Sequence, residues 1–221
     1  MPIFKQINKD FFKHWTPEMA YVLGFFAADG YITVNKRGGQ FWSIQIIDQK
    51  LLEQIKKIIG SNHKIGVRTR KENENTVYRL QIGSIEMCND LRKLGYGERK
   101  TKNMSIPSVP RKFFPDFLRG YFDGDGNVWV GYKHKDKKPT LTMQVSFTSC
   151  SGVFLSSLRE VLANFGLGKG SLYDRDTAFR LSYSAMDGIK LYRLMYLCYS
   201  IGELYLPRKR KVFERFIKMR A

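Results

Sequence analysis

Cysteine is scarce in this chain, and its placement does not indicate disulfide bonding. The cysteines Cys88, Cys150 and Cys198 are odd in number, widely spaced and never arranged as C-x-x-C. We therefore expect three reduced, buried thiols in an intracellular compartment. Residues 1–15 carry charges where a secretion signal needs an apolar stretch, so no targeting signal is visible. This pattern fits a microbial cytoplasm and the interior of an organelle equally.

Long apolar runs and acidic residues are also few. No segment reaches the roughly 18 apolar residues that a membrane-spanning helix needs. Only 20 Asp and Glu face 38 Lys and Arg, which leaves a net charge of +18. A folded chain with this much like charge repels itself unless a polyanion neutralises it. The chain has no clustered basic amphipathic helix, so nucleic acid is favoured over an acidic membrane surface as the partner.

The same series of elements occurs twice along the chain. A helix is predicted at 17–29, where Thr16 provides an N-cap and Pro17 the first helical position, and a second helix is predicted at 115–125. The later matching pairs are strands 31–34 and 127–132, strands 41–47 and 141–147, helices 51–60 and 154–166, strands 76–84 and 177–185, and helices 87–96 and 188–197. The sequence therefore predicts an α+β fold of two pseudo-symmetric α-β-β-α-β-β-α repeats. They occupy residues 1–104 and 116–221, and residues 105–115 form a proline-containing linker.

Small residues recur four apart in the first helix of each repeat. Gly24 and Ala28 form one such pair, and Gly120 and Gly124 form the other. This spacing places small residues on one helix face, where two backbones can approach closely. The surrounding residues are almost all apolar, as expected of helices buried at an interface. We therefore expect the two helices to pack against each other at a central seam.

An acidic residue ends each of these apolar helices. Asp29 and Asp125 lie 96 residues apart, each in the last helical turn and each followed by glycine. The helix dipole is negative at that end, so a carboxylate there is disfavoured. Packing of the helices would bring both carboxylates together, where they repel unless a proton or cation intervenes. Carboxylate and carbonyl oxygens are the ligands that Mg²⁺ prefers.

The segments VLGFFAADG (22–30) and LRGYFDGDG (118–126) resemble two copies of the LAGLIDADG motif. The first copy departs from the motif at its sixth position, where Ala27 stands and the second copy has Asp123. The resemblance implies a monomeric homing endonuclease whose two antiparallel sheets form a saddle in the major groove of double-stranded DNA. It also implies that each strand is cut once across the minor groove, leaving short 3′ overhangs.

The resemblance further implies specific site residues. Asp29 and Asp125 would bind divalent metal with help from the carbonyls of Ala28 and Gly124. Mg²⁺ is the expected metal; Mn²⁺ would substitute for it, and Ca²⁺ would bind without supporting cleavage. The basic residue expected near each scissile phosphate matches Lys100 and Lys209 best. Alternatives within one or two residues are Arg99, Lys102, Arg208 and Arg210. A polar residue at the end of the second strand would orient water, and the candidates are Asp48 and Thr148.

Strand alternation predicts which side chains face the DNA, because successive residues point to opposite faces of a sheet. Arg, Lys and Gln are the usual readers of base edges in the major groove, and others of the set would only position phosphates. The predicted contacts are Thr33, Asn35, Arg37, Ser43, Gln45, Lys64, Arg68, Arg70, Arg79, Gln81, Lys133, Thr142, Gln144, Ser146, Arg180 and Ser182. The two faces differ in sequence, which predicts a long, non-palindromic target. The apolar residues between them, such as Val67, are expected to cover the core.

Two other functions are compatible with a LAGLIDADG-like chain. One is an RNA-binding maturase that helps an intron fold, and the other is a DNA-binding regulator with an inactive site. The presence of both acids argues against the inactive form, whereas maturase activity could coexist with cutting. No splicing segments flank the motifs, so carriage by an intron is favoured over carriage by an intein. No protein partner is required by this interpretation.

Overall fold

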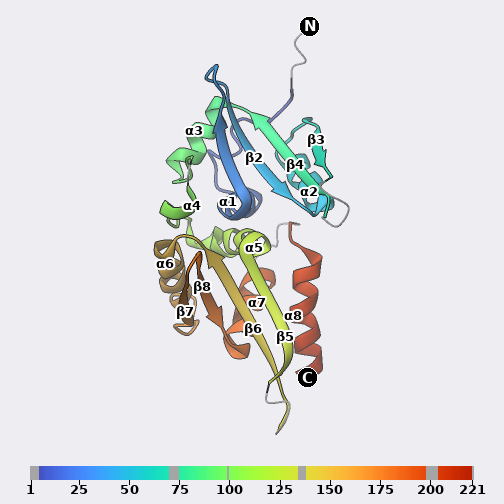
Figure 1. Cartoon of the computed structure of the whole chain (residues 1–221), viewed down its shortest axis with the longest axis vertical. Coiled ribbons are helices and arrows are strands. Elements are labelled where there is room, and N and C mark those ends of the chain that lie inside the picture. Colours follow the sequence, from blue (N-terminus) through green and yellow to red (C-terminus); the bar gives the residue numbers. More distant parts are fainter. Residues whose placement is uncertain (1–4, 70–74, 99, 134–137, 198–203, 221) are drawn as a thin grey trace.

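The computed structural model describes residues 5–69, 75–98, 100–133, 138–197 and 204–220. It has an α+β fold in which two similar halves, each with its own sheet, lie on either side of a central pair of helices (Figure 1). Within the described ranges, no helix is long and apolar enough to cross a membrane.

The first half holds a four-stranded antiparallel sheet in the order β1-β2-β4-β3. Its elements are α1 (Pro17–Asp29), β1 (Gly30–Val34), β2 (Gln40–Ile46), α2 (Gln49–Ile58), β3 (Ile65–Arg68), β4 (Val77–Gly83), α3 (Ile85–Lys93) and the short α4 (Lys100–Asn103). The Thr16 hydroxyl accepts a hydrogen bond from the Met19 N–H at 3.0 Å, so the predicted N-cap is confirmed.

The second half repeats this order with the sheet β5-β6-β8-β7. Its elements are η1 (Arg111–Phe113), α5 (Phe114–Asp125), β5 (Gly126–Lys133), β6 (Thr140–Ser149), α6 (Gly152–Ala163), β7 (Ser171–Arg175), β8 (Ala178–Tyr183), α7 (Ala185–Tyr196) and α8 (Pro207–Arg220). In this half Val145 pairs with Tyr183, and in the first half Ile44 pairs with Leu80. All four side chains are buried on the core side of their sheets. The predicted repeat of two α-β-β-α-β-β-α units is confirmed.

The close approach of α1 and α5 depends on their glycines. A Cβ added at Gly24 would lie 2.0 Å from the Phe117 carbonyl oxygen, and one at Gly120 would lie 2.0 Å from that of Tyr21. These two contacts are equivalent under the pseudo-twofold symmetry, so each helix presses its glycine onto the backbone of the other. The predicted central seam is therefore present.

Gly30 and Gly126 directly follow the two acids. Both glycines have extended backbone angles and begin the next strand. A Cβ at either position would lie about 2 Å from the ring of the phenylalanine four residues earlier, Phe26 or Phe122. The glycines therefore make room for a buried ring where helix passes directly into strand.

Three sequence-based expectations are wrong. Cys150 is exposed, because it lies in the turn between β6 and α6 rather than in the core, while Cys88 is buried as expected. Val67 is also exposed, on the strand β3 that lies at the edge of the sheet. The basic segment after residue 206 forms the helix α8, in which Phe213 and Phe216 are buried, so the expectation that the chain has no clustered basic amphipathic helix is also wrong. Cys198 lies outside the described residues.

Candidate active site

Asp29 and Asp125 end the two central helices and are brought together by the α1–α5 seam. Both side chains are partly buried. A Cβ at Gly124 would lie 3.0 Å from the Asp29 Oδ2 oxygen, so the carboxylate of α1 rests against the last turn of α5. The absence of a side chain at Gly124 leaves the space that this carboxylate occupies. The structure thus places the two acids as the sequence predicts.

The surroundings of these acids disfavour their charged forms. Burial raises the pKa of Asp29 to about 6, the charge of Asp125 adds to the rise, and Lys209 and Lys100 oppose it. Burial also raises the pKa of Asp125, against the opposing effect of the same two lysines. Two partly desolvated carboxylates that repel each other are stabilised by any cation placed between them. The electrostatics of the pair therefore favour a bound cation.

Lys209, on the first turn of α8, points into the end of α5. Its Nζ donates hydrogen bonds to the carbonyl oxygens of Phe122 at 2.7 Å, Asp123 at 2.8 Å and Gly126 at 2.6 Å, with Gly124 at 3.3 Å. The residue is only 8% exposed. Burial lowers its pKa to about 8, although the carboxylates of Asp123, Asp29 and Asp125 work against this. The ammonium group thus binds carbonyls at the negative end of the helix and at the start of β5, and the Phe122 carbonyl also accepts from the Gly126 N–H.

Lys100, on α4, makes the corresponding contact in the first half with fewer bonds. Its Nζ donates to the Ala27 carbonyl oxygen at 2.5 Å and lies 5.6 Å from the centre of the Phe26 ring. Burial lowers its pKa to about 8, while Asp125 and Asp29 work in the opposite direction. Both lysines predicted from the motif positions therefore reach the paired acids from opposite halves.

The donor set fits a hard divalent cation. Asp29 and Asp125 offer carboxylate oxygens, and the ends of α1 and α5 offer carbonyl oxygens, which together match the preference of Mg²⁺ for oxygen ligands. Among the described residues there is no cluster of three or more His, Cys, Asp or Glu side chains, so two acids and the backbone would have to hold the metal. The Gly124 carbonyl also accepts from Lys209, which limits its availability to a metal.

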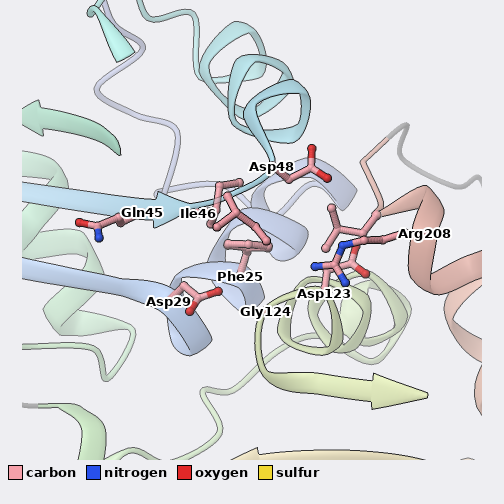
Figure 2. Close-up of a pocket in the computed structure, with 10 residues that line it drawn as sticks. Phe25, Asp29, Gln45, Ile46, Asp48, Asp123, Gly124 and Arg208 are labelled. Atoms are coloured by element: carbon pink, nitrogen blue, oxygen red, sulfur yellow. The ribbon is translucent and has the colours of Figure 1, made fainter. Parts of the chain in front are cut away.

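A cavity of about 230 Å³ opens beside Asp29 (Figure 2). Gln45 and Asp48 from the first half and Asp123 and Arg208 from the second half line it, so it spans the seam. Arg208 is exposed, unlike its neighbour Lys209. Asp48 does not serve only to orient water, because its side chain accepts from the Leu51 N–H at 3.2 Å and caps α2. Thr148 is half buried on the same sheet face as Arg180, with which it pairs.

Asp123 and Tyr21 are functional candidates that the sequence did not single out as a pair. The Asp123 carboxyl is 2% exposed and accepts hydrogen bonds from the Tyr21 hydroxyl at 2.7 Å and the Leu206 N–H at 2.8 Å. Burial raises its pKa to about 6 against the effect of these bonds. The available sequence signal was the acid at the sixth motif position, which the first copy lacks.

The strand faces bring most of the predicted DNA contacts together. Gln45, Arg68 and Arg79 line one depression of about 270 Å³ on the first sheet. On the second sheet, Gln144 pairs with Trp129 and Arg180 pairs with Tyr173. The predicted contacts that are exposed are Thr33, Asn35, Arg37, Lys64, Arg68, Arg79, Lys133, Gln144 and Arg180, and Gln45, Gln81 and Thr142 are half buried.

Three of the predicted contacts need correction, and one cannot be placed. Ser43, Ser146 and Ser182 lie on the polar face but are buried at 0%, 4% and 5% exposure, because a short serine side chain stays close to the backbone of the sheet. Asn35 uses its side-chain oxygen to accept from the N–H groups of Arg37 at 3.0 Å and Gly39 at 2.8 Å. Its oxygen therefore shapes the turn, which leaves the Nδ2 group to contact a base. Arg70 lies outside the described residues.

Aromatic residues on the second sheet were missed by sequence reasoning. Trp129 is 45% exposed and Tyr173 is 47% exposed, each beside a polar predicted contact on the same face. Strand alternation places them there, but only polar side chains were predicted to contact DNA. Exposed aromatic rings beside Gln144 and Arg180 add apolar surface that can contact a thymine methyl group.

Two repeats joined through paired helices, with one acid at the end of each helix, define a two-motif architecture. The model of the LAGLIDADG-like domain matches residues 16–95 and again residues 116–193. The chain therefore belongs to the LAGLIDADG family, as the motif resemblance predicts.

A curated protein also matches most of this chain in sequence. The chain is 30% identical over 179 residues to the probable translation initiation factor IF-2 of Thermococcus kodakarensis; the match covers 77% of this chain and 14% of that relative. Because the chain spans about one seventh of that length, the activity in the relative's name is not carried over.

Solved structures of LAGLIDADG nucleases share the fold. The homing endonuclease I-SmaMI bound to cleaved DNA has a TM-score of 0.59 and 15% identity, and 93% of this chain and 89% of that chain are covered. I-SmaMI bound to an uncleaved DNA target in the presence of calcium ions has a TM-score of 0.56 and 13% identity, with coverage of 93% and 90%. At these identities the likeness establishes the homing-endonuclease fold.

Proposed function

We propose that this chain is a site-specific endonuclease that cuts both strands of a long, asymmetric double-stranded DNA target. The reaction depends on a divalent cation, with Mg²⁺ the expected ion, Mn²⁺ a substitute, and Ca²⁺ an ion that supports binding without cleavage. Each strand is cut once across the minor groove, leaving short 3′ overhangs. The enzyme acts as a monomer because both acids belong to one chain.

The observation that carries this proposal is the convergence of Asp29 and Asp125 between two lysines. Two buried carboxylates with raised pKa values have no structural advantage at helix C-termini, where the dipole already disfavours negative charge. The arrangement becomes favourable when a cation binds. Acidic residues with shifted pKa values that converge beside a cavity are typical of an active site.

The residues around the pair have separate roles in phosphodiester hydrolysis. When bound, a divalent cation supplies Lewis-acid activation of water and offsets charge on the phosphate. Asp29 and Asp125 provide its negatively charged ligands. Arg208, exposed in the cavity that Asp29 lines, presents a guanidinium that can bind a phosphate oxygen in bidentate fashion. Lys100 and Lys209 keep positive charge beside each scissile phosphate and hold the ends of α1 and α5.

The two strand faces supply recognition. Gln45, Arg68 and Arg79 on the first sheet and Gln144 and Arg180 on the second are the side chains best placed for base edges in the major groove. The net charge of +18 provides sequence-independent attraction to phosphates. The relatives I-SmaMI with cleaved and uncleaved DNA support this assignment, because they share the fold.

The test is cleavage of a partly randomised DNA library in Mg²⁺, followed by sequencing of the cut ends. The wild type is expected to select an asymmetric site and to leave 3′ overhangs. Asp29→Asn and Asp125→Asn are expected to abolish double-strand cleavage in Mg²⁺ while the protein still binds the selected site in Ca²⁺. The exposed Asp174→Asn is the matched control and is expected to cut at the wild-type rate.

Other outcomes identify the alternatives. Tight DNA binding without cleavage in Mg²⁺ or Mn²⁺ would indicate a DNA-binding regulator. Preferential binding of a structured RNA, with no cut DNA, would indicate an RNA maturase. Wild-type cleavage by both Asp→Asn variants would show that the two acids are not the metal ligands.

A further inference from the structure

Asp123 joins three elements that meet beside the paired acids. It lies on α5, and its Oδ2 oxygen accepts from the Tyr21 hydroxyl of α1 and from the Leu206 N–H that immediately precedes α8. The carboxyl group is 2% exposed, and its second oxygen has no hydrogen-bond partner among the described residues. A charged acceptor at this depth is costly to bury, so its bonds must compensate in part. The Leu206 bond is the only one of the two that reaches α8.

The Leu206 bond holds the residue that immediately precedes α8. The Leu206 carbonyl accepts from the Lys209 N–H at 3.1 Å, which forms part of the first turn of that helix. Lys209 therefore follows the anchored residue within one helical turn, where the rise is about 1.5 Å per residue. A shift of Leu206 would move the Lys209 ammonium away from the carbonyls of Phe122 and Gly126 that it now contacts. Arg208, which shares the cavity with Asp29 and Asp123, would move with it (Figure 2).

Among the residues of the first half that the structure describes, none forms an equivalent of this anchor. Ala27 occupies the motif position of Asp123, and its methyl side chain cannot accept a hydrogen bond. Lys100, the counterpart of Lys209, lies on the four-residue α4 and donates to a backbone carbonyl, that of Ala27. The two lysines therefore lie near the same acids but are held in place differently, Lys100 by the short α4 and Lys209 by α8 with its Asp123–Leu206 bond.

We propose that Asp123 is a positioning residue for only one of the two strand cuts, the cut made beside the N-terminus of α8. It holds Leu206 so that Lys209 and Arg208 are presented to one scissile phosphate, and the cut beside α4 does not depend on it. This inference rests on the proposed endonuclease function. It makes the two halves of the active site unequal despite their similar acids.

The experiment measures the cutting rate of each strand separately, on a target labelled at either 5′ end. Lys209→Met and Lys100→Met first identify which strand each half serves. Asp123→Ala reproduces the side chain of Ala27. It is expected to lower the cutting rate of the same strand that Lys209→Met affects, on the order of tenfold, because a hydrogen bond to a charged acceptor is lost. The other strand is expected to keep its rate within about threefold. Asp123→Asn keeps an acceptor oxygen for Leu206 and is expected to restore most of the lost rate.

Hydrogen exchange of the metal-free protein gives a readout that does not depend on cleavage. In Asp123→Ala, the amides of residues 204–212 are expected to exchange faster, while those of residues 100–104 do not change. Tyr21→Phe, which removes only the bond to α1, is the matched control and is expected to leave residues 204–212 protected.

The outcomes separate this inference from the proposed function. If Asp123→Ala lowers the cutting rates of both strands equally, the role of Asp123 is overturned and the endonuclease function stands. The same holds if the ratio of the two cutting rates and the hydrogen exchange at residues 204–212 are both unchanged. A wild type that cuts no DNA would remove the strand effect along with the proposed function. In that case the exchange measurement still decides whether Asp123 anchors α8.

Discussion

The Asp29 carboxyl is easier to protonate in the folded protein than in the unfolded chain. Its pKa rises from an ordinary 3.8 to about 6, first because of burial and second because of Asp125. The folded state therefore binds this proton more tightly, and the associated stability is complete below pH 3.8 and is lost as the pH rises through 6. Above that range the charged Asp29 imposes a constant cost on the metal-free protein.

Asp29→Asn is accordingly expected to stabilise the metal-free protein at about pH 8, by up to about 3 kcal/mol for a shift of roughly two pKa units. At about pH 5 the gain should fall to about half, because the folded wild type is then largely protonated at this site. Urea unfolding in the presence of a chelator measures both values. The exposed Asp174→Asn is the control and should change the unfolding free energy by less than about 0.5 kcal/mol. An equal gain at both pH values would contradict this account.

The polar strand face also has consequences for single residues. Gln144 is exposed on β6, whereas Ser146, two residues along the same face, is 4% exposed. Gln144→Ala is expected to weaken discrimination at one base pair of the target by about 1–3 kcal/mol. Ser146→Ala should leave target affinity and preference unchanged, because a buried hydroxyl does not reach a base. Binding to a panel of single-base target variants distinguishes the two. If only Ser146→Ala changed the base preference, the prediction that exposed Gln144 and not buried Ser146 contacts a base would be wrong.

At the scale of elements, the contact between α1 and α5 holds the two halves together. Gly120→Ala is expected to destabilise the protein by about 3 kcal/mol or more, because its Cβ would meet the Tyr21 backbone, which cannot move aside as a flexible side chain can. Gly66→Ala on β3 is the matched control, since a Cβ there would lie 3.7 Å from the Arg79 carbonyl oxygen in ordinary contact. Chemical denaturation measures both. Equal stability of Gly120→Ala and the wild type would mean that the helices can separate freely.

The same contact controls the geometry of the acids. Asp29 rests against Gly124, so any widening of the helix pair would separate the two carboxylates. In the proposed function, small residues such as Gly124 therefore set the distance between the two acids, although they carry no reactive group themselves. This explains why the glycines and the acids occur in the same short segments of the sequence.

At the scale of the whole molecule, the charge of +18 should dominate the salt dependence of DNA binding. For six or more phosphate contacts, the slope of log K against log salt is expected to be about −5 or steeper. Lys133→Gln, at an exposed position on β5, should make the slope less negative by about one unit if that lysine contacts a phosphate. Titrations at several salt concentrations measure this, and a slope near zero would exclude the phosphate backbone as the main source of affinity.

The sequence by itself determined the repeat, the central helices and the paired acids. These features depend on local patterns, namely alternation in strands, helical periodicity, and small residues four apart, such as Gly120 and Gly124, which can be read without knowing distant neighbours. The positions of Asp29 and Asp125 followed from the same patterns, since a residue at the end of a buried helix goes where that helix packs. Lys100 and Lys209 followed from the motif resemblance.

Only the tertiary structure decided which of the polar residues are accessible and how they are supported. Ser43 and Ser182 have the right strand position but are buried. The bond between Asp123 and Leu206 joins residues 83 positions apart, and the Lys209 ammonium reaches carbonyls 83 to 87 positions away. Such contacts depend on distances between elements that are remote in the chain, and a local sequence pattern carries no information about those distances.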